Sequence, residues 1–373
     1  MLHTDIPSRT DIEHLSAVRD EMCVSIYLPT TPLTRAIDKD RIALKNLART
    51  ALERLRARHT DKKSVDAIEE ELGCLLEDDE FWAHQANSLA LFVTPERLVS
   101  FRLADNLEPM VTVADRFHIN PLLRAVTVPQ SAFVLALAQG SVRLVEVSAD
   151  MPPFSVDVPG MPTDVESAAG TSPTTSRAMN GRVQGAEGQK VRMRQYARMV
   201  DQKLRAVLSG RETPLILAAA APIDSIFRSV NTYPFLAKEG IDGNPEKLTD
   251  AELALASRAV LDRLHSSAVA ELCDLFEVRS HEARTTTDIA QAARAATFGA
   301  VAVLLVDIDA VVPGLVDEDG GVELHDTSGP VSYGVTDEIA RRSLATGARV
   351  LGVRKNEVPG GGPVAAILRY PLK

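Results

Sequence analysis

Residues 181–208 read GRVQGAEGQKVRMRQYARMVDQKLRAVL, a glycine-containing loop that leads directly into a basic amphipathic helix. The loop ends at Gly188 and Gln189. The preceding segment, 159–187, is poor in large apolar residues, so it cannot bury enough surface to fold by itself. A loop of this length in a compact protein is usually functional or disordered, and we expect it to be mobile.

The helix is predicted from one apolar face at spacings of three and four: Met193, Tyr196, Ala197, Val200, Leu204, Val207 and Leu208.

Positive charge is concentrated on the remaining faces of this helix. The segment 182–211 has an excess of six positive charges, whereas the whole chain carries a formal charge of -10. The acidic total argues against bulk attraction to nucleic acid, but a local basic surface can still position RNA phosphates. The alternative is a solvated helix whose arginines only improve solubility and helix propensity. The candidate RNA-binding residues are Arg182, Lys190, Arg192, Arg194, Arg198 and Arg205.

Length and composition place the chain among soluble globular proteins of two or three domains. It has 373 residues, of which 45% are hydrophobic and 25% are charged. Its three cysteines, Cys23, Cys74 and Cys273, form no CxxC pair, so neither a disulfide framework nor a zinc site is indicated. The first residues lack a basic and then apolar leader, and no apolar run is long enough to span a membrane. We therefore expect a cytoplasmic protein without a membrane partner.

The first domain, 1–128, is predicted to be α/β with a helical hairpin. The segment 23–28, CVSIYL, is typical of a strand and is followed by the breaker PTTP. Apolar residues at helical spacing then predict two helices, over 44–55 and 65–76. Three further strands are predicted at 88–93, 98–103 and 110–114.

The second domain, 129–245, is predicted to contain a mixed sheet with helices packed on it. A β-hairpin is expected over 132–147, a strand over 154–158, and a buried strand over 214–221, PLILAAAA. The segment 231–247 is dense in turn-forming residues and is predicted to be a linker.

The third domain, 246–373, is predicted to be an α/β sandwich. Thr249 and Glu252 form a capping box at the start of a helix with a break near Ser266. Helices are further expected over 287–296 and 336–346, and a polar excursion over 307–334. The predicted strands are 278–280, 300–306, 350–353 and 365–367.

The order of elements resembles the central domain of archaeal and eukaryotic class I peptide-chain release factors. The strand FSVDVPG (154–160) is followed by the glycine-containing loop, Gly188-Gln189, the basic helix and the apolar strand PLILAAAAPI (214–223). The whole chain is similar to bacterial relatives of that superfamily. This wider similarity rests on CVSIYLPT (23–30), YPFLAKEGIDGNPEKLT (233–249) and ARVLGVRKNEVPGGG (348–362).

The resemblance implies a role for the glycine and glutamine of the loop. In that superfamily a Gly-Gly-Gln motif enters the ribosomal peptidyl-transferase centre. There the glutamine N–H stabilises the attack of water on the peptidyl-tRNA ester, and its side chain helps to exclude other nucleophiles. Gly188 and Gln189 match the last two motif positions and are the candidate catalytic residues, but Glu187 stands at the first. A β-carbon and a negative charge there oppose backbone freedom and entry into a phosphate-lined tunnel.

Other patterns do not indicate a cofactor or a metal. The acidic residues of 307–319 fit no EF-hand spacing and are interpreted as a solvated turn. The segment 358–363, VPGGGP, lacks the Gly-Lys-Ser/Thr ending of a P-loop, and no GxSxG elbow occurs.

Three functions stay open from the sequence. The first is a release-factor-like protein that docks on ribosome and tRNA, with hydrolysis of the peptidyl-tRNA ester as its chemistry. The second is a non-catalytic ribosome- or RNA-binding regulator that retains the loop and helix. The third, a small-molecule hydrolase, is weakened because no nucleophile–base motif is present. No DNA partner is expected.

Overall fold

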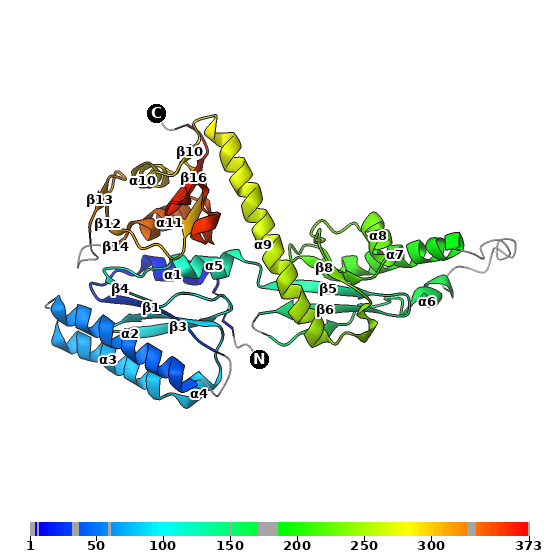
Figure 1. Cartoon of the computed structure of the whole chain (residues 1–373), viewed down its shortest axis with the longest axis horizontal. Coiled ribbons are helices and arrows are strands. Elements are labelled where there is room, and N and C mark those ends of the chain that lie inside the picture. The colour runs from blue at the N-terminus through cyan, green and yellow to red at the C-terminus, as the bar shows by residue number, and fades with distance from the viewer. Residues whose placement is uncertain are drawn as a thin grey trace. The chain divides into compact units, whose positions relative to one another are not determined.

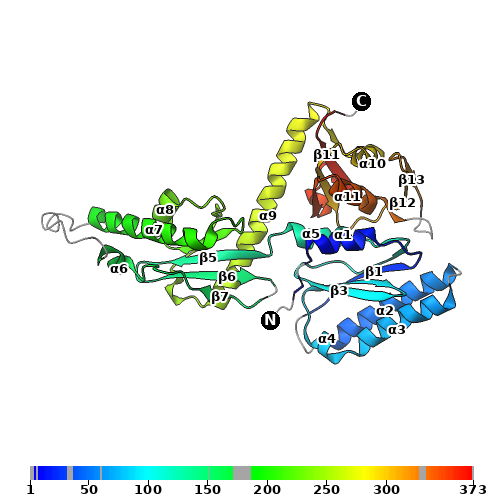
Figure 2. The same ribbon diagram turned by 180° about the vertical axis from the view of Figure 1, so that it is seen from behind.

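The computed structural model describes residues 4, 5, 7–31, 37–58, 61–149, 151–170, 186–326 and 333–371. The chain forms two compact units (Figures 1 and 2). Unit 1 consists of Met1–Val128 and Ala268–Lys373, and unit 2 consists of Pro129–Ser267. Unit 2 is thus inserted between the two halves of unit 1. The division into three domains stays a prediction.

Four antiparallel strands form the first sheet of unit 1, in the order β3-β2-β1-β4. Residues 23–28 of the central strand β1 are all buried, because both faces of the sheet are covered. The predicted strands are confirmed, with bounds β1 (Cys23–Pro29), β2 (Ser88–Thr94), β3 (Arg97–Leu103) and β4 (Met110–Ala114).

The predicted helical hairpin covers one face of this sheet. Helices α2 (Ile37–Ala57) and α3 (Lys62–Glu77) lie side by side, in blue in Figures 1 and 2. Alternate β1 residues such as Val24 and Ile26 share one apolar cluster with Leu44 of α2. A short helix, α4 (Asp79–Ala83), follows the hairpin.

The opposite face of the sheet shares a hydrophobic core with the C-terminal part of the chain. Tyr27 and Phe92 from the first sheet belong to one cluster with Val301 and Ile339. Two helices from the first half of the chain, α1 (Arg9–Ala17) and α5 (Asn120–Thr127), also contribute to this cluster. Because the cluster draws on both halves, unit 1 needs both to bury its apolar surface.

The C-terminal part of unit 1 contains a four-stranded and a three-stranded sheet. The first has the order β10-β16-β11-β15, and the second has the order β13-β12-β14. The three-stranded sheet lies within the segment predicted as a polar excursion. The bounds are β10 (Thr285–Thr286), α10 (Ile289–Thr297), β11 (Val301–Asp307), β12 (Pro313–Val316), β13 (Val322–Leu324), β14 (Tyr333–Gly334), α11 (Val335–Ala345), β15 (Arg349–Val353), η3 (Lys355–Glu357), η4 (Pro359–Gly361) and β16 (Val364–Leu368).

Unit 2 is built on a five-stranded mixed sheet, as predicted. Its order is β7-β6-β5-β8-β9, with antiparallel pairing from β5 to β7 and parallel pairing from β5 to β9. The strands are β5 (Ser131–Leu137), β6 (Val142–Ser148), β7 (Phe154–Val156), β8 (Leu215–Ala219) and β9 (Ile241–Asp242).

Helices cover both faces of this sheet. Phe133 and Leu135 of β5 cluster with α7 (Ala186–Leu208), and α6 (Val165–Gly170) and α8 (Ile223–Val230) complete that layer. The alternate residue Val134 clusters with Leu253 of α9 (Asp250–Ser280). The sheet is therefore buried on both sides, which explains the continuous apolar strands.

Two predictions about the segment 231–280 are wrong. The segment 231–247, predicted to be a linker, belongs to unit 2. It includes η2 (Pro245–Lys247), and the carbonyl of its Phe235 accepts a hydrogen bond from Leu215 N at 2.9 Å. Helix α9 continues through Ser266 and includes 278–280, predicted to be a strand. Three residues are too few for periodicity to distinguish helix from strand.

The capping box of Thr249 and Glu252 is confirmed, with Glu252 N donating to Thr249 Oγ1 at 3.2 Å. None of the described helices is long and apolar enough to cross a membrane.

Two buried carboxylates at the start of α11 join the halves of unit 1. Asp337 accepts hydrogen bonds from Ile119 N at 2.8 Å, Asn120 N at 3.0 Å and the His118 ring at 2.5 Å. Glu338 is the second of the pair. Its donors are Arg116 at 2.8 Å, Arg341 at 2.6 and 2.9 Å, and Arg342 at 2.8 Å. Burial opposes the ionised form of Glu338, but the hydrogen bonds from Arg341 and Arg342 and the neighbouring positive charges outweigh it and lower its pKa to about 2.

The lowered pKa of Glu338 predicts that the protein loses stability in acid. The stabilisation attached to ionised Glu338 is complete above its ordinary pKa of 4.5 and is lost as the pH falls towards 2. We expect the free energy of unfolding to lose about 3 kcal/mol from this group between pH 5 and pH 2. Urea unfolding across this range should show a shallower decline for Glu338→Gln than for the unchanged chain. Glu70→Gln, on the exposed face of α3, serves as the control. Equal declines in all three proteins would contradict the assignment.

Candidate nucleic-acid interface

The structure places Gly188 and Gln189 in the first turn of α7, not at the end of a loop. The helix begins at Ala186, three residues earlier than Gln189. Gly188 is buried, so packing outweighs the weak helix propensity of glycine. Glu187 is the second residue of the helix. Arg182 lies outside the described residues.

The predicted apolar face of α7 is buried against the unit 2 sheet. It belongs to the cluster that includes Phe133, Leu135 and Leu217. This burial fixes the rotation of the helix and thereby decides which side chains face outward. The buried residues of α7 are Met193, Tyr196, Ala197, Val200, Leu204 and Leu208.

Three cations form a stripe along one flank of α7. Lys190, Arg194 and Arg198 are exposed and follow one another at intervals of four residues, so they lie on the same side of the helix. Arg192 is also exposed but points to the other flank, because two residues correspond to about 200° of helix rotation. Within the described part of the chain, none of these four side chains has a hydrogen-bond or ion-pair partner.

Arg205, the remaining candidate, is already engaged. Its guanidinium lies 3.2 Å from Asp201, which is buried. Asp201 also accepts from Thr232 N at 2.9 Å and Thr232 Oγ1 at 2.8 Å. Arg205 therefore helps to hold the end of α7 and is less available to RNA than the stripe of Lys190, Arg194 and Arg198.

The Gln189 side chain is held by a residue that the sequence did not single out. Gln189 Nε2 donates to Oε1 of Gln139, in the turn between β5 and β6, at 3.2 Å. The Gln139 carbonyl accepts from Val165 N at 2.9 Å, and Gly140 N donates to Glu246 Oε1 at 3.1 Å. The sequence marks Gln139-Gly140 as a turn, but the pairing with Gln189 depends on tertiary packing. Gln189 thus lies near the carboxyl end of the parallel strand β5, an edge where α/β sheets commonly bind ligands.

The region matched by a known family coincides with unit 2. Residues 129–267 match the family described as bacterial archaeo-eukaryotic release factor family 11, and these are the bounds of unit 2. Unit 2 is therefore similar to the archaeo-eukaryotic release factors. The resemblance inferred from the sequence is confirmed for these residues, although Gly188 and Gln189 are helical.

The chain shows some similarity to several solved structures. Dom34 of S. cerevisiae, a translation termination-like factor, is 12% identical, with 76% of this chain and 80% of that chain covered and a TM-score of 0.40. Pelota of Archaeoglobus fulgidus is 12% identical over 100% of this chain and 95% of that chain, with a TM-score of 0.38. The archaeal termination factor aRF1 is 14% identical over 98% and 99%, with a TM-score of 0.23. No curated protein matches the sequence.

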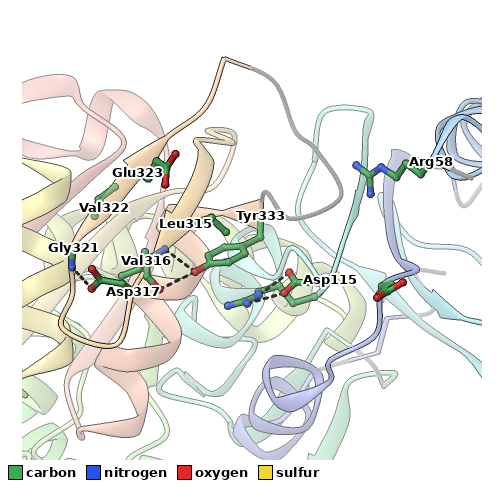
Figure 3. A pocket seen from close by; sticks show the side chains of 11 residues that line it. Arg58, Asp115, Leu315, Val316, Asp317, Gly321, Val322, Glu323 and Tyr333 are labelled. Atoms are coloured by element: carbon green, nitrogen blue, oxygen red, sulfur yellow. Dashed lines mark hydrogen bonds and ion pairs between the residues drawn. The ribbon is translucent and has the colours of Figure 1, made fainter. Parts of the chain in front are cut away.

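Unit 1 contains a hollow of about 910 Å³ (Figure 3). The ring of Tyr333 lies over the Arg116 guanidinium at 3.4 Å, and its hydroxyl accepts from Val316 N at 2.7 Å. At one end, Asp317 accepts from Asp319 N at 3.0 Å and Gly321 N at 2.6 Å, so this carboxylate orders a turn. Among the described residues, no group of three His, Cys, Asp or Glu side chains gathers to hold a metal.

The buried tyrosine of α7 has an unusual environment. Tyr196 is fully buried, and its hydroxyl has no hydrogen-bond partner in the described part of unit 2. Burial raises the pKa of Tyr196, and the negative charges of Asp164 and Glu246 add to the increase. No described residue replaces the bonds to water that this hydroxyl loses on folding, and such a loss costs free energy.

Removal of this hydroxyl should not weaken the protein. For Tyr196→Phe we expect an unchanged or higher free energy of unfolding, by up to about 1–2 kcal/mol, because an unsatisfied polar group is removed. Tyr233→Phe is the matched control in the same unit, since its hydroxyl donates to Thr213 O at 2.7 Å. That variant should lose about 1 kcal/mol. Urea unfolding measures both, and a larger loss for Tyr196→Phe than for Tyr233→Phe would show that Tyr196 is bonded in solution.

Proposed function

We propose that this release-factor relative docks on ribosomal RNA or tRNA through helix α7 of unit 2. The observation that carries the proposal is the stripe of Lys190, Arg194 and Arg198, whose cations face outward without a partner in the described residues. Arg192 extends the basic surface to the other flank. Val191, between these cations in sequence, is 61% exposed and adds an apolar contact.

The stripe is unfavourable for an isolated helix. Like charges four residues apart destabilise a helix by about 0.2–0.5 kcal/mol per pair, and this stripe contains two such pairs. All three residues also lie in the N-terminal two-thirds of α7, away from the C-terminal end where cations are favoured. A surface that only improved solubility would not need this arrangement. Phosphate oxygens would offset the repulsion, because Lys and Arg position proteins on RNA backbones.

The family match favours RNA of the translation apparatus over other polyanions. It covers the unit that contains α7, and it is independent of the charge argument. The formal charge of -10 limits docking to this local surface, so binding should depend strongly on orientation and salt. A cytoplasmic location follows from the proposed partner.

Removal of two positive charges from the stripe should weaken docking on the ribosome without lowering the stability of the protein. For Arg194→Gln with Arg198→Gln we expect weaker co-sedimentation with ribosomes and a smaller salt dependence, by about one unit of log–log slope per lost phosphate contact. The free energy of unfolding should stay equal or rise slightly, because repulsion along α7 is relieved. Lys45→Gln with Arg97→Gln removes the same charge from exposed positions of unit 1 and is the control. Equal ribosome binding by both double variants would remove α7 from the proposal.

A second candidate function, peptidyl-tRNA ester hydrolysis, concerns Gln189. It is favoured by Gly188 and Gln189 at the last two motif positions of the family, and a backbone N–H aimed at a developing oxyanion is worth about 2.7–4 kcal/mol. Against it, Gln189 lies in a helical turn and its amide is held by Gln139. The first turn of α7 would have to open before Gln189 could reach an ester. The non-catalytic regulator therefore fits the observed geometry more directly.

Peptide release from stalled ribosomes distinguishes these two functions. If the protein hydrolyses the ester, Gln189→Ala should reduce release by about 100-fold while ribosome co-sedimentation is unchanged. Gln139→Ala is the matched variant: it frees the Gln189 amide and should maintain or increase release. Absence of release by the unchanged protein would exclude hydrolysis and leave the docking proposal intact.

A further inference from the structure

The buried Glu338 of unit 1 gathers more positive charge than it neutralises. Arg116, Arg341 and Arg342 donate to its two oxygens, and Arg19 Nη2 lies 3.9 Å from Oε2. Asp115 is a second carboxylate in the group. It accepts from Arg116 at 2.9 and 3.0 Å. Glu338 is therefore contacted by four guanidinium groups, of which one, Arg116, also binds Asp115.

Two of these arginines are fully used inside the cluster. Arg116 divides its donors between Asp115 and Glu338 and stacks on Tyr333. Arg342 donates to Glu338, to Thr297 Oγ1 at 2.6 Å and to Val316 O at 3.1 Å. Their side chains are only 16% and 15% exposed. They act as positioning residues that hold Glu338 and the surrounding backbone.

The other two arginines have donors that face outward. Arg341 donates to Glu338 through Nε and Nη2, and its Nη1 has no partner among the described residues. Arg19 Nη1 donates to the carbonyls of Ser16 at 2.7 Å and Val18 at 2.6 Å. Among the described residues, Arg19 Nη2 has no contact closer than the 3.9 Å to Glu338 Oε2. The side chains of Arg19 and Arg341 are 39% and 33% exposed. Both are thus held at the cluster with donors left for solvent.

We propose that Arg19 and Arg341 form a binding site for a phosphoryl-type oxyanion on unit 1. Guanidinium groups recognise phosphate and carboxylate oxygens through paired N–H donors, and buried carboxylates orient them for this purpose. Burial, followed by the positive charges of Arg116 and Arg341, lowers the pKa of Arg19. A bound dianion relieves this crowding. The site is separate in residues and in unit from the α7 stripe, so it does not depend on the proposed docking function.

Titration with inorganic phosphate and pyrophosphate tests the site in the full chain. At constant ionic strength set with potassium chloride, both anions should bind and raise the midpoint of thermal unfolding. Arg19→Gln with Arg341→Gln should weaken the affinity by about tenfold or more, because charge-assisted hydrogen bonds are lost. Arg49→Gln with Arg97→Gln removes the same charge from exposed positions of unit 1 and should bind like the unchanged chain. Arg341→Lys keeps the charge but loses the paired donors, so its affinity should lie between the two.

Two further ligands identify the source of the oxyanion. Tighter binding of ATP than of pyrophosphate, lost in Arg19→Gln with Arg341→Gln, would point to a free nucleotide. Binding of a structured RNA that this variant weakens, measured in a background of Arg194→Gln with Arg198→Gln, would point to an RNA backbone. Either result supports the site. Equal affinities of the unchanged chain and the Arg19/Arg341 variant for all four ligands would overturn it, whatever the outcome for α7.

Discussion

Burial of one hydrophobic core by both halves of unit 1 is the constraint on which the rest of the fold depends. The first sheet can cover one face with α2 and α3, but the face that carries Tyr27 and Phe92 is buried with C-terminal residues such as Val301 and Ile339. The residues of unit 2 are therefore an insertion between the two halves of unit 1 in the sequence. Asp337 strengthens the same junction, since three hydrogen bonds from residues 118–120 compensate the loss of its hydration.

In unit 2, apolar packing and electrostatics have separate roles on one helix. The sheet fixes the rotation of α7 by burying residues such as Tyr196 and Leu204. That rotation leaves Lys190, Arg194 and Arg198 exposed although they repel one another. The helix thus presents charge at a cost in its own stability, which is the property expected of a binding surface. Unit 1 shows a related arrangement, in which the buried Glu338 holds Arg341 while this arginine keeps one nitrogen, Nη1, without a partner among the described residues.

Glu187, which stands at the first position of the release-factor motif, is the second residue of α7. The same helix brings Gln189 to Gln139 of the β5–β6 turn. The sequence predicted Gly188 and Gln189 at the end of a mobile loop, whereas the structure places both in the first turn of α7.

Local patterns in the sequence were enough to predict β1, the α2–α3 hairpin, the β5–β6 hairpin, the apolar face of α7 and the capping box at Thr249, because periodicity and caps act over a few residues. The short strands β12 to β14 escaped prediction, and residues 278–280 were assigned wrongly, since segments of two to four residues carry little periodicity. Only the tertiary structure decided that Gln139 holds Gln189 and that Glu338 collects arginines from both halves of unit 1. These contacts join residues up to hundreds of positions apart, and their partners are selected by packing of the sheets and not by local sequence.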